Sequence, residues 1–329
     1  MLATPSAALG LIPALLVAGS VGATGPAPAR LERSVYAMGT RLSIDAEGPS
    51  DEVLRTATEA AFRESERIEA ACSTWRADSS WSRLNRARGA EVPLDREWLE
   101  LLSTILDFNR KTDGAFDPVL GAVLQAWGTR TGGRTPSAEE LARARAASGA
   151  RLLSLDLARG VARLGHPEAA VEEGGFLKGY ALDRMAGVLL AAGVRDALLD
   201  FGGQLRVVGR PRSVSLAAPD DRHRATLSFL LGPGSLSSSG TSEHGRHILD
   251  PKSGVASPAW GSVSVVAPDG LTADVLSTAL YVMGPERGRA WADAHQVAAV
   301  FQRPGRPPLE SRSALDLNLH PALATETPR

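Results

Sequence analysis

Three oxygen-bearing side chains in the last quarter of the sequence have the types and spacing to bind a hard metal ion. Asp274 and Thr278 stand four positions apart in the segment 272–283, whose apolar pattern predicts a helix, so their side chains share one face. A carboxylate and a hydroxyl suit Mg²⁺ rather than Zn²⁺, and Ser277 could add another oxygen directly or through water. The alternative is that Asp274 only interacts favourably with the helix dipole.

His247 is the candidate base. It precedes Asp250-Pro251 and follows a Ser/Gly-rich stretch, 236–241, which is expected to be a loop. A histidine can accept a proton at neutral pH, and the hydroxyls of the stretch could donate to phosphate oxygens. Equally, His247 could be a hydrogen-bonded structural residue and the hydroxyls could form turns. The sequence has no GxSxG motif of a serine hydrolase.

A glycine-rich segment around Lys178 is the candidate anion site. Gly174 and Gly175 let a ligand approach the backbone, and a helix is predicted to begin near Lys178 and Gly179. Free N–H groups at a helix start, beside a lysine, attract anions. The spacing is not that of a Walker A loop, and an ordinary loop–helix–strand unit with a solvated lysine is the alternative.

The remaining pattern predicts the elements that must position these residues. Ser50 caps a helix over 51–71, Asp117 and Pro118 start a helix that runs to 127–128, and Ser137 and Glu140 form a capping box. Further predictions are a helix at 98–108, a hairpin at 152–164, and strands at 197–201, 204–208, 214–217, 226–231, 262–267 and 297–301. One domain over 30–303 is expected, followed by a disordered tail at 304–329.

Composition limits the partners and the compartment. The net charge of −1 over 329 residues gives no reason to expect a nucleic-acid partner. The one cysteine, Cys72, excludes an internal disulfide and a cysteine-based zinc site, and we expect it in the core. Residues 1–29 resemble an export signal with small residues before Thr24, so a periplasmic or exported, non-lipoprotein location is expected; the alternative is an uncleaved anchor.

Taken together, these motifs resemble one family, the FAD:protein FMN transferases or ApbE family. The resemblance rests on motifs that occur in the family's order between Met38 and Val300: Met-Gly-Thr (38–40), Ser-Thr-Trp with Asp-Ser and Leu-Asn (73–85), Gly-Ala-Phe-Asp-Pro (114–118), Gly-Gly-Phe-Leu-Lys-Gly-Tyr-Ala-Leu-Asp (174–183), Asp-Phe-Gly-Gly (200–203), Ser-Ser-Gly (238–240), His-Ile-Leu-Asp-Pro-Lys-Ser-Gly (247–254) and Ala-Asp-Val-Leu-Ser-Thr (273–278). Each motif is weak alone, and the set is specific.

The resemblance implies a fold, a reaction and a set of site residues. The fold would be α+β, a single domain with mixed or antiparallel sheets flanked by helices. The enzyme would use Mg²⁺ to move FMN from FAD to a Ser or Thr hydroxyl of an acceptor protein, releasing AMP. His247 matches the catalytic histidine, and the metal residues would be Gly175 (through its carbonyl), Asp274, Ser277 and Thr278. The FAD contacts would be Met38, Trp75, Ala115, Phe116, Asp117, Glu172, Lys178 and Ile248.

Some features depart from the family pattern or leave alternatives open. Glu173 replaces an apolar residue, Arg246 stands where a second histidine is frequent, and the segment between Gly240 and His247 is short. The same site with water as nucleophile would make an FAD pyrophosphatase, and a flavin-binding protein without catalysis is a third reading. The acceptor, or an uncleaved N-terminal segment, would bring the protein near a membrane.

Overall fold

A fully antiparallel eight-stranded sheet forms the centre of the protein. The computed structural model describes residues 28–240 and 248–322. The strand order is β1-β2-β6-β7-β10-β11-β12-β13. The strands are β1 (Ala29–Ala37), β2 (Thr40–Gly48), β6 (Asp196–Phe201), β7 (Gln204–Val208), β10 (Gly234–Gly240), β11 (Ser262–Ala267), β12 (Ala298–Gln302) and β13 (Leu309–Glu310). Alternation along β6 sends Leu199 to one face and Leu198 to the other, so both faces are apolar and both are covered.

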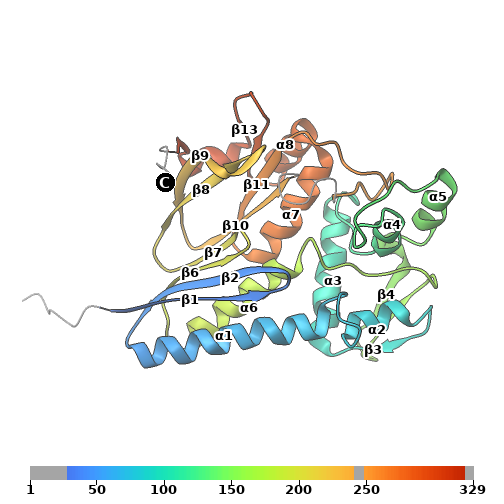
Figure 1. Cartoon of the computed structure of the whole chain (residues 1–329), viewed down its shortest axis with the longest axis horizontal. Helices are drawn as coiled ribbons and strands as arrows, with labels where there is room; N and C mark the ends of the chain where they lie inside the picture. The colour runs from blue at the N-terminus through green and yellow to red at the C-terminus, as the bar shows by residue number, and fades with distance from the viewer. Residues whose placement is uncertain (1–27, 241–247, 323–329) are drawn as a thin grey trace, which may run out of the picture.

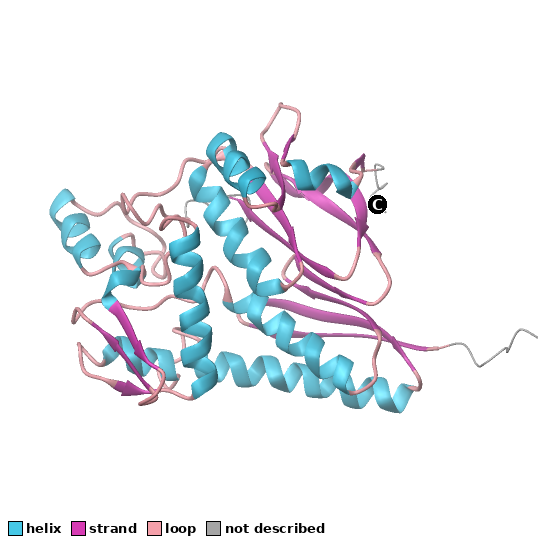
Figure 2. Ribbon diagram, turned by 180° about the vertical axis from the view of Figure 1, so that it is seen from behind, coloured by secondary structure: helices cyan, strands magenta, loops and turns pink. Residues whose placement is uncertain are grey.

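Helices cover one face of this sheet, and a small second sheet covers the other (Figures 1 and 2). The helices are α1 (Asp51–Cys72), α6 (Leu177–Ala191), α7 (Gly270–Met283) and α8 (Pro285–Ala294). The second sheet has the order β14-β9-β8, from His320–Pro321, Asp221–Leu231 and Arg212–Ala218, and it packs on the large sheet together with the 3-10 helix η2 (Arg312–Leu317). The result is a helix–sheet–sheet arrangement.

A smaller unit extends from one end of the helical layer (Figure 1). It consists of α2 (Ser80–Arg86), α3 (Arg96–Lys111), α4 (Gly121–Ala126), α5 (Ala138–Ala146), the 3-10 turn η1 (Ala150–Leu152) and a three-stranded sheet of β3 (Val92–Pro93), β5 (Val161–Leu164) and β4 (Leu153–Asp156). Trp98 and Leu164 of this unit belong to the same hydrophobic cluster as Ile44 and Leu199 of the large sheet. This continuous core makes the chain one α+β domain.

Local sequence signals predicted several boundaries correctly. Ser50 accepts a hydrogen bond from the Val53 N–H at the start of α1, and Ser137 with Glu140 forms the expected capping box of α5. The hairpin expected at 152–164 is β4–β5, and Cys72 is buried. In the part of the chain that the structure describes, no helix is both long and apolar enough to span a membrane.

Three predictions about local structure are wrong. The helix expected from Asp117 begins at Gly121, because the Asp117 carboxylate accepts from Val119 N and also from Ala150 N of a distant turn. The serine stretch 236–239 is not a loop but part of β10, which pairs on both sides. Residues 304–322, expected to be disordered, contain β13, η2 and β14, because Ala314 and Leu317 complete an apolar cluster against the large sheet.

The closest backbone contact relevant to the site joins α6 and α7. A Cβ atom added to Gly179 would lie 2.2 Å from the Gly270 carbonyl oxygen, and one added to Gly270 would lie 2.4 Å from the Gly179 oxygen. The two helices therefore meet backbone to backbone at their first turns. Glycine is required at both positions because any side chain would force the helices apart.

We expect Gly179→Ala to lower the free energy of unfolding by ~1–3 kcal/mol, as overpacking does at a rigid contact. Gly187→Ala on the same helix is the matched control, because its added Cβ meets nothing within 4 Å. That control should be neutral or stabilising by ~0.5–1 kcal/mol, since alanine favours a helix over glycine. Urea unfolding of both variants measures the difference. Equal unfolding midpoints for the two would contradict the close contact.

Candidate active site

Two carboxylates hold the crossing of α6 and α7 together. Asp274 of α7 accepts a hydrogen bond of 3.0 Å from the Gly179 N–H of α6. In the opposite direction, Asp183 of α6 accepts from Gly270 N at 2.7 Å and Leu271 N at 2.9 Å, the free amides at the start of α7. Each helix thus caps the other. The capping fixes Asp274 relative to Lys178 and the 174–179 segment.

Asp274 is a buried carboxylate whose ionised form a nearby positive charge would stabilise. Its side chain is buried, and this desolvation raises the pKa of its carboxyl, while Lys178 and the Gly179 N–H act in the opposite direction. Lys178 lowers the pKa of Asp274 through its charge and not through a hydrogen bond. An ionised carboxylate at this position would be stabilised by a bound cation.

The expected metal residues lie together, with one difference in role. A Cβ on Gly175 would lie 3.2 Å from Thr278 Oγ1, so the Gly175 backbone is directly beside the hydroxyl one helical turn after Asp274. Ser277 instead bridges elements: it donates to the Asp274 carbonyl at 3.0 Å and contacts Ser239 Oγ at 2.9 Å. These oxygen donors fit Mg²⁺ in chemical type. No group of three His, Cys, Asp or Glu side chains suited to a metal occurs within 28–240 and 248–322.

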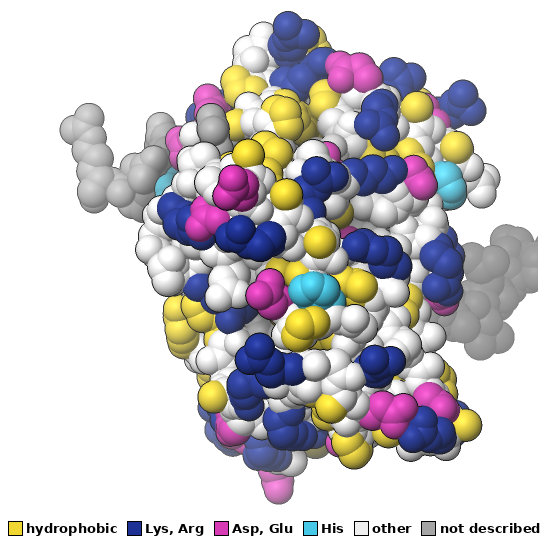
Figure 3. Space-filling model, turned by 90° about the vertical axis from the view of Figure 1, so that its right-hand side faces the viewer, with side chains coloured by type: hydrophobic (Ala, Val, Ile, Leu, Met, Phe, Trp, Pro, Cys, Tyr) yellow, Lys and Arg dark blue, Asp and Glu magenta, His cyan; other side chains and the backbone are white. Residues whose placement is uncertain are grey.

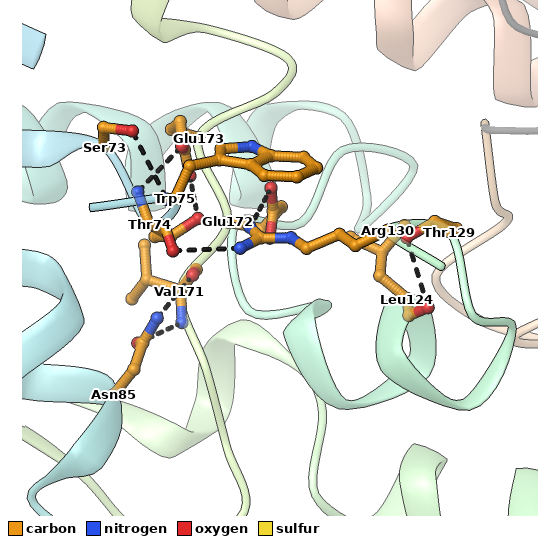
Figure 4. Close-up of polar contacts among 10 residues, drawn as sticks. All are labelled: Ser73, Thr74, Trp75, Asn85, Leu124, Thr129, Arg130, Val171, Glu172 and Glu173. Carbon is orange, nitrogen blue, oxygen red and sulfur yellow. Dashed lines mark hydrogen bonds and ion pairs between the residues drawn. The ribbon is translucent and has the colours of Figure 1, made fainter. Parts of the chain in front are cut away.

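Trp75 and Glu172 belong to one polar cluster, shown in Figure 4. The Trp75 side chain is 67% exposed, and the Arg130 guanidinium lies over its ring, 4.2 Å from the centroid. Arg130 also donates to both carboxylate oxygens of Glu172, at 3.0 and 2.7 Å. Burial and the adjacent Glu173 raise the pKa of Glu172 to about 7, against the opposing effect of Arg130. Arg130 therefore favours the ionised form of Glu172.

The unusual Glu173 is a structural residue of this cluster. It is 8% exposed, and its carboxylate accepts from Thr74 N at 2.8 Å and from the Thr74 hydroxyl. Its backbone carbonyl accepts from Phe176 N and Leu177 N at the start of α6. A buried carboxylate thus joins the loop that carries Trp75 to the segment that carries Gly175, and an apolar residue could not make the two Thr74 contacts.

The 115–117 segment contacts the site through its aromatic residue. Phe116 packs edge-on against Phe176, with ring centroids 6.1 Å apart, and a Cβ on Gly175 would lie 3.1 Å from its ring. Ala115 is buried. The Asp117 side chain is held by Val119 N, Ala150 N and Asn109, and burial raises the pKa of its carboxyl. Any ligand contact at 115–117 is therefore left to the backbone and Phe116.

The other expected site residues lie on other elements or outside the described residues. Met38 is at the β1–β2 turn with a φ of 42°, and its N–H donates to Glu69 at 3.3 Å. Ile248 is 9% exposed and packs in the cluster of Leu276 and Val263 beneath α7. His247 lies outside the described residues, so its candidate role stays a prediction. Arg130 and Asp183 were missed as site residues by sequence reasoning; only the helical spacing of Asp183 from Gly179 could have indicated it.

A basic cleft adjoins the site at the end of the molecule that carries α5. Its volume is about 640 Å³, and Arg145, Arg151, Lys252 and Asp117 are among its lining residues. Figure 3 shows Lys and Arg side chains spread over this end with acidic side chains between them. Apart from Asp117, none of the expected FAD or metal residues lines it.

Comparisons with known proteins agree with the geometry. The family model described as the ApbE family matches residues 38–301. The FAD:protein FMN transferase of Haemophilus influenzae is 27% identical over 254 residues, which cover 70% of this chain and 73% of that protein. The FAD:protein FMN transferase of Rhodobacter capsulatus is 30% identical over 84% of this chain and 56% of that protein.

A solved structure shows the same fold. The ApbE protein of Thermotoga maritima superposes with a TM-score of 0.80 at 27% identity, covering 88% of this chain and 99% of that one. The matched residues 38–301 include the α6–α7 crossing, the Trp75 loop and the 114–118 segment. By the extent of this match and the agreement of the folds, the chain belongs to the ApbE family.

Proposed function

We propose that the protein transfers FMN from FAD to a Ser or Thr hydroxyl of an acceptor protein, with Mg²⁺, and releases AMP. As a member of its family the chain is a flavin transferase, and its curated relatives are FAD:protein FMN transferases. The observation that carries the proposal is the buried Asp274 beside Lys178, with Thr278 and the Gly175 backbone next to it. This arrangement suits a metal cation and a pyrophosphate anion, whose opposite charges stabilise each other.

The proposed reaction breaks one bond and forms one at phosphorus. The acceptor hydroxyl oxygen attacks the phosphorus of the FMN half, the bond from that phosphorus to the AMP oxygen breaks, and AMP leaves. The hydroxyl proton passes to a base, for which His247 is our candidate. Lys178, at the positive N-terminal end of α6, would face the phosphate oxygens and offset their charge.

The metal would be held by Asp274, Thr278 and the Gly175 carbonyl. Bound Mg²⁺ would neutralise charge that develops on the pyrophosphate oxygens. Ser277 would keep Asp274 in place, since its hydroxyl ties the Asp274 carbonyl to Ser239 of β10. We assign the FAD contacts to Met38, Trp75, the 115–117 segment, Glu172, Lys178 and Ile248, as the family resemblance implies.

We expect Asp274→Asn to lose Mg²⁺-dependent turnover, with ~2–4 kcal/mol less transition-state stabilisation. The amide can still accept from Gly179 N but carries no charge for the metal. Burial raises the pKa of Asp274 in the folded protein. At a pH above the unfolded-state pKa, ionising this buried carboxyl therefore lowers the stability of the metal-free protein. Asparagine cannot ionise, so the variant should not lose stability in this way.

The measurements for Asp274 are turnover against Mg²⁺ concentration and the melting temperature with and without Mg²⁺. Mg²⁺ should raise the melting temperature of the wild type and leave that of Asp274→Asn unchanged. Full activity of the variant at limiting Mg²⁺ would show that the metal assignment is wrong.

We expect His247→Asn to keep FAD affinity and to lower turnover by roughly 10²–10⁴-fold, the usual effect of removing a positioned base. Wild-type activity should rise with pH through the histidine range, near 6.5, and the variant should lack that rise. His320→Asn, at an exposed position of β14, is the matched control. If His247 instead has a structural role, His247→Asn should lower both thermal stability and FAD affinity. Measuring the melting temperature, the FAD affinity and the mass of the acceptor therefore separates a catalytic role from a structural one. Acceptor modification at the normal rate would rule His247 out.

The same assay distinguishes transfer from hydrolysis. Purified protein is incubated with FAD and Mg²⁺, with and without a candidate acceptor, and the acceptor is weighed. Transfer adds the mass of FMN less one water to the acceptor, whereas release of free FMN and AMP without acceptor modification would support the pyrophosphatase instead.

We further propose that the protein is exported and that its mature form starts near Thr24, because the 7–21 stretch is apolar and small residues precede that position. These residues lie outside the described part of the structure. Intact-mass measurement of the protein from a periplasmic fraction checks this expectation. A cytosolic species that still carries Met1 would contradict it.

A further inference from the structure

Arg130 is the residue that joins three separate parts of the polar cluster. It lies in the turn after α4, and its side chain reaches the 73–75 loop and the 171–173 segment (Figure 4). Its Nη1 donates to the Thr74 carbonyl at 2.9 Å, and its Nη2 donates to the Thr74 hydroxyl and to both carboxylate oxygens of Glu172. The flat guanidinium also covers one face of Trp75.

The turn that presents Arg130 is built by its backbone. Gly133 N donates to the Gly128 carbonyl at 2.9 Å, and Arg134 N donates to the Trp127 carbonyl at 2.8 Å. Gly128 and Gly133 have φ values of 62° and 83°, which favour glycine. The closed turn leaves Arg130 near its tip, so the position of the guanidinium follows from local geometry as well as from its partners.

The contacts of Arg130 have two effects on its neighbours. An indole that is 67% exposed would otherwise change rotamer freely, and the stacked cation holds it in one orientation. Nη2 of Arg130 contacts both oxygens of the Glu172 carboxylate, whose side chain is 18% exposed, and so directs this carboxylate toward the same loop and favours its ionised form. A planar aromatic ring and an oriented hydrogen-bond acceptor are thereby fixed side by side.

We propose that Arg130 is a positioning residue for the nucleotide substrate. It fixes Trp75 and Glu172 as one platform, on which a planar heteroaromatic ring of FAD stacks while Glu172 accepts from an N–H of the ligand. This inference rests on the proposed function, because the assignment of Trp75 and Glu172 to FAD does. Arg130 itself stays under the platform, since its contacts to Thr74 and Glu172 and its stacking on Trp75 hold it there.

The test compares Arg130→Met, which keeps an unbranched side chain but removes the charge, with Arg130→Lys, which keeps the charge but lacks the planar guanidinium. Arg134→Met is the matched control, because Arg134 lies in the same turn and pairs with Glu140 on the surface. We expect Arg130→Met to raise the Kd and the KM for FAD by roughly 10-fold or more, with kcat changed much less. Arg130→Lys should recover part of the affinity, and Arg134→Met should match the wild type.

Two further measurements separate positioning from general stability. In a double-mutant cycle, Trp75→Ala and Arg130→Met should have non-additive effects on FAD affinity, because each removes the same platform. Binding of FMN and of AMP alone identifies the ring that stacks there: the affinity of that half should fall in Arg130→Met and stay unchanged in Arg134→Met.

The outcomes separate this inference from the proposed function. If the wild type binds FAD and modifies the acceptor while a folded Arg130→Met does both equally well, the role of Arg130 is wrong and the proposed function stands. Additive effects in the cycle would overturn it in the same way. If the wild type binds no FAD, both fail. If FAD binds and responds to Arg130→Met but no acceptor is modified, the role of Arg130 stands and only the transfer reaction is wrong.

Discussion

The backbone contact between Gly179 and Gly270 is the constraint on which the site depends. Because the first turns of α6 and α7 touch, the free amides of each helix come within reach of a carboxylate on the other. Asp183 satisfies the start of α7, and Asp274 satisfies one amide of α6 while remaining buried beside Lys178. The same contact therefore supplies a rigid crossing, two converging helix N-termini and a buried carboxylate whose charge Lys178 and the Gly179 N–H only partly offset.

The rest of the site is attached to this crossing by the segment that leads into α6. Glu173 ties it to the Trp75 loop, Phe176 ties it to Phe116, and Gly175 lies against Thr278. Three stretches far apart in the sequence are thus placed by one short connection. Substituting Glu173 by an apolar residue would remove one of these ties and leave the half-buried Thr74 N–H without its carboxylate partner.

Sequence reasoning predicted what local chemistry determines and failed where distant partners decide. The cap of α1 by Ser50 and the Asp274–Thr278 helix face depend on residues three or four apart, so both could be predicted. Ser238 and its neighbours favour turns, but pairing of β10 with β7 and β11 outweighs that preference. Asp117 has a side chain suited to capping a helix, but its carboxylate accepts a hydrogen bond from the distant Ala150 N–H. Arg130 carried no signal, because its partners are 42 and 56 residues away.

The hydrogen bond between Asp274 and Gly179 also bears on how the protein folds. Its partners are separated by 95 residues, and the strands β6 to β11 lie between them in the chain. Closing so long a loop costs conformational entropy, so we expect the crossing to form late, after the strands between the two helices have paired. A partly folded chain would lack this crossing, and the proposed nucleotide and metal site would therefore form only when the core is complete.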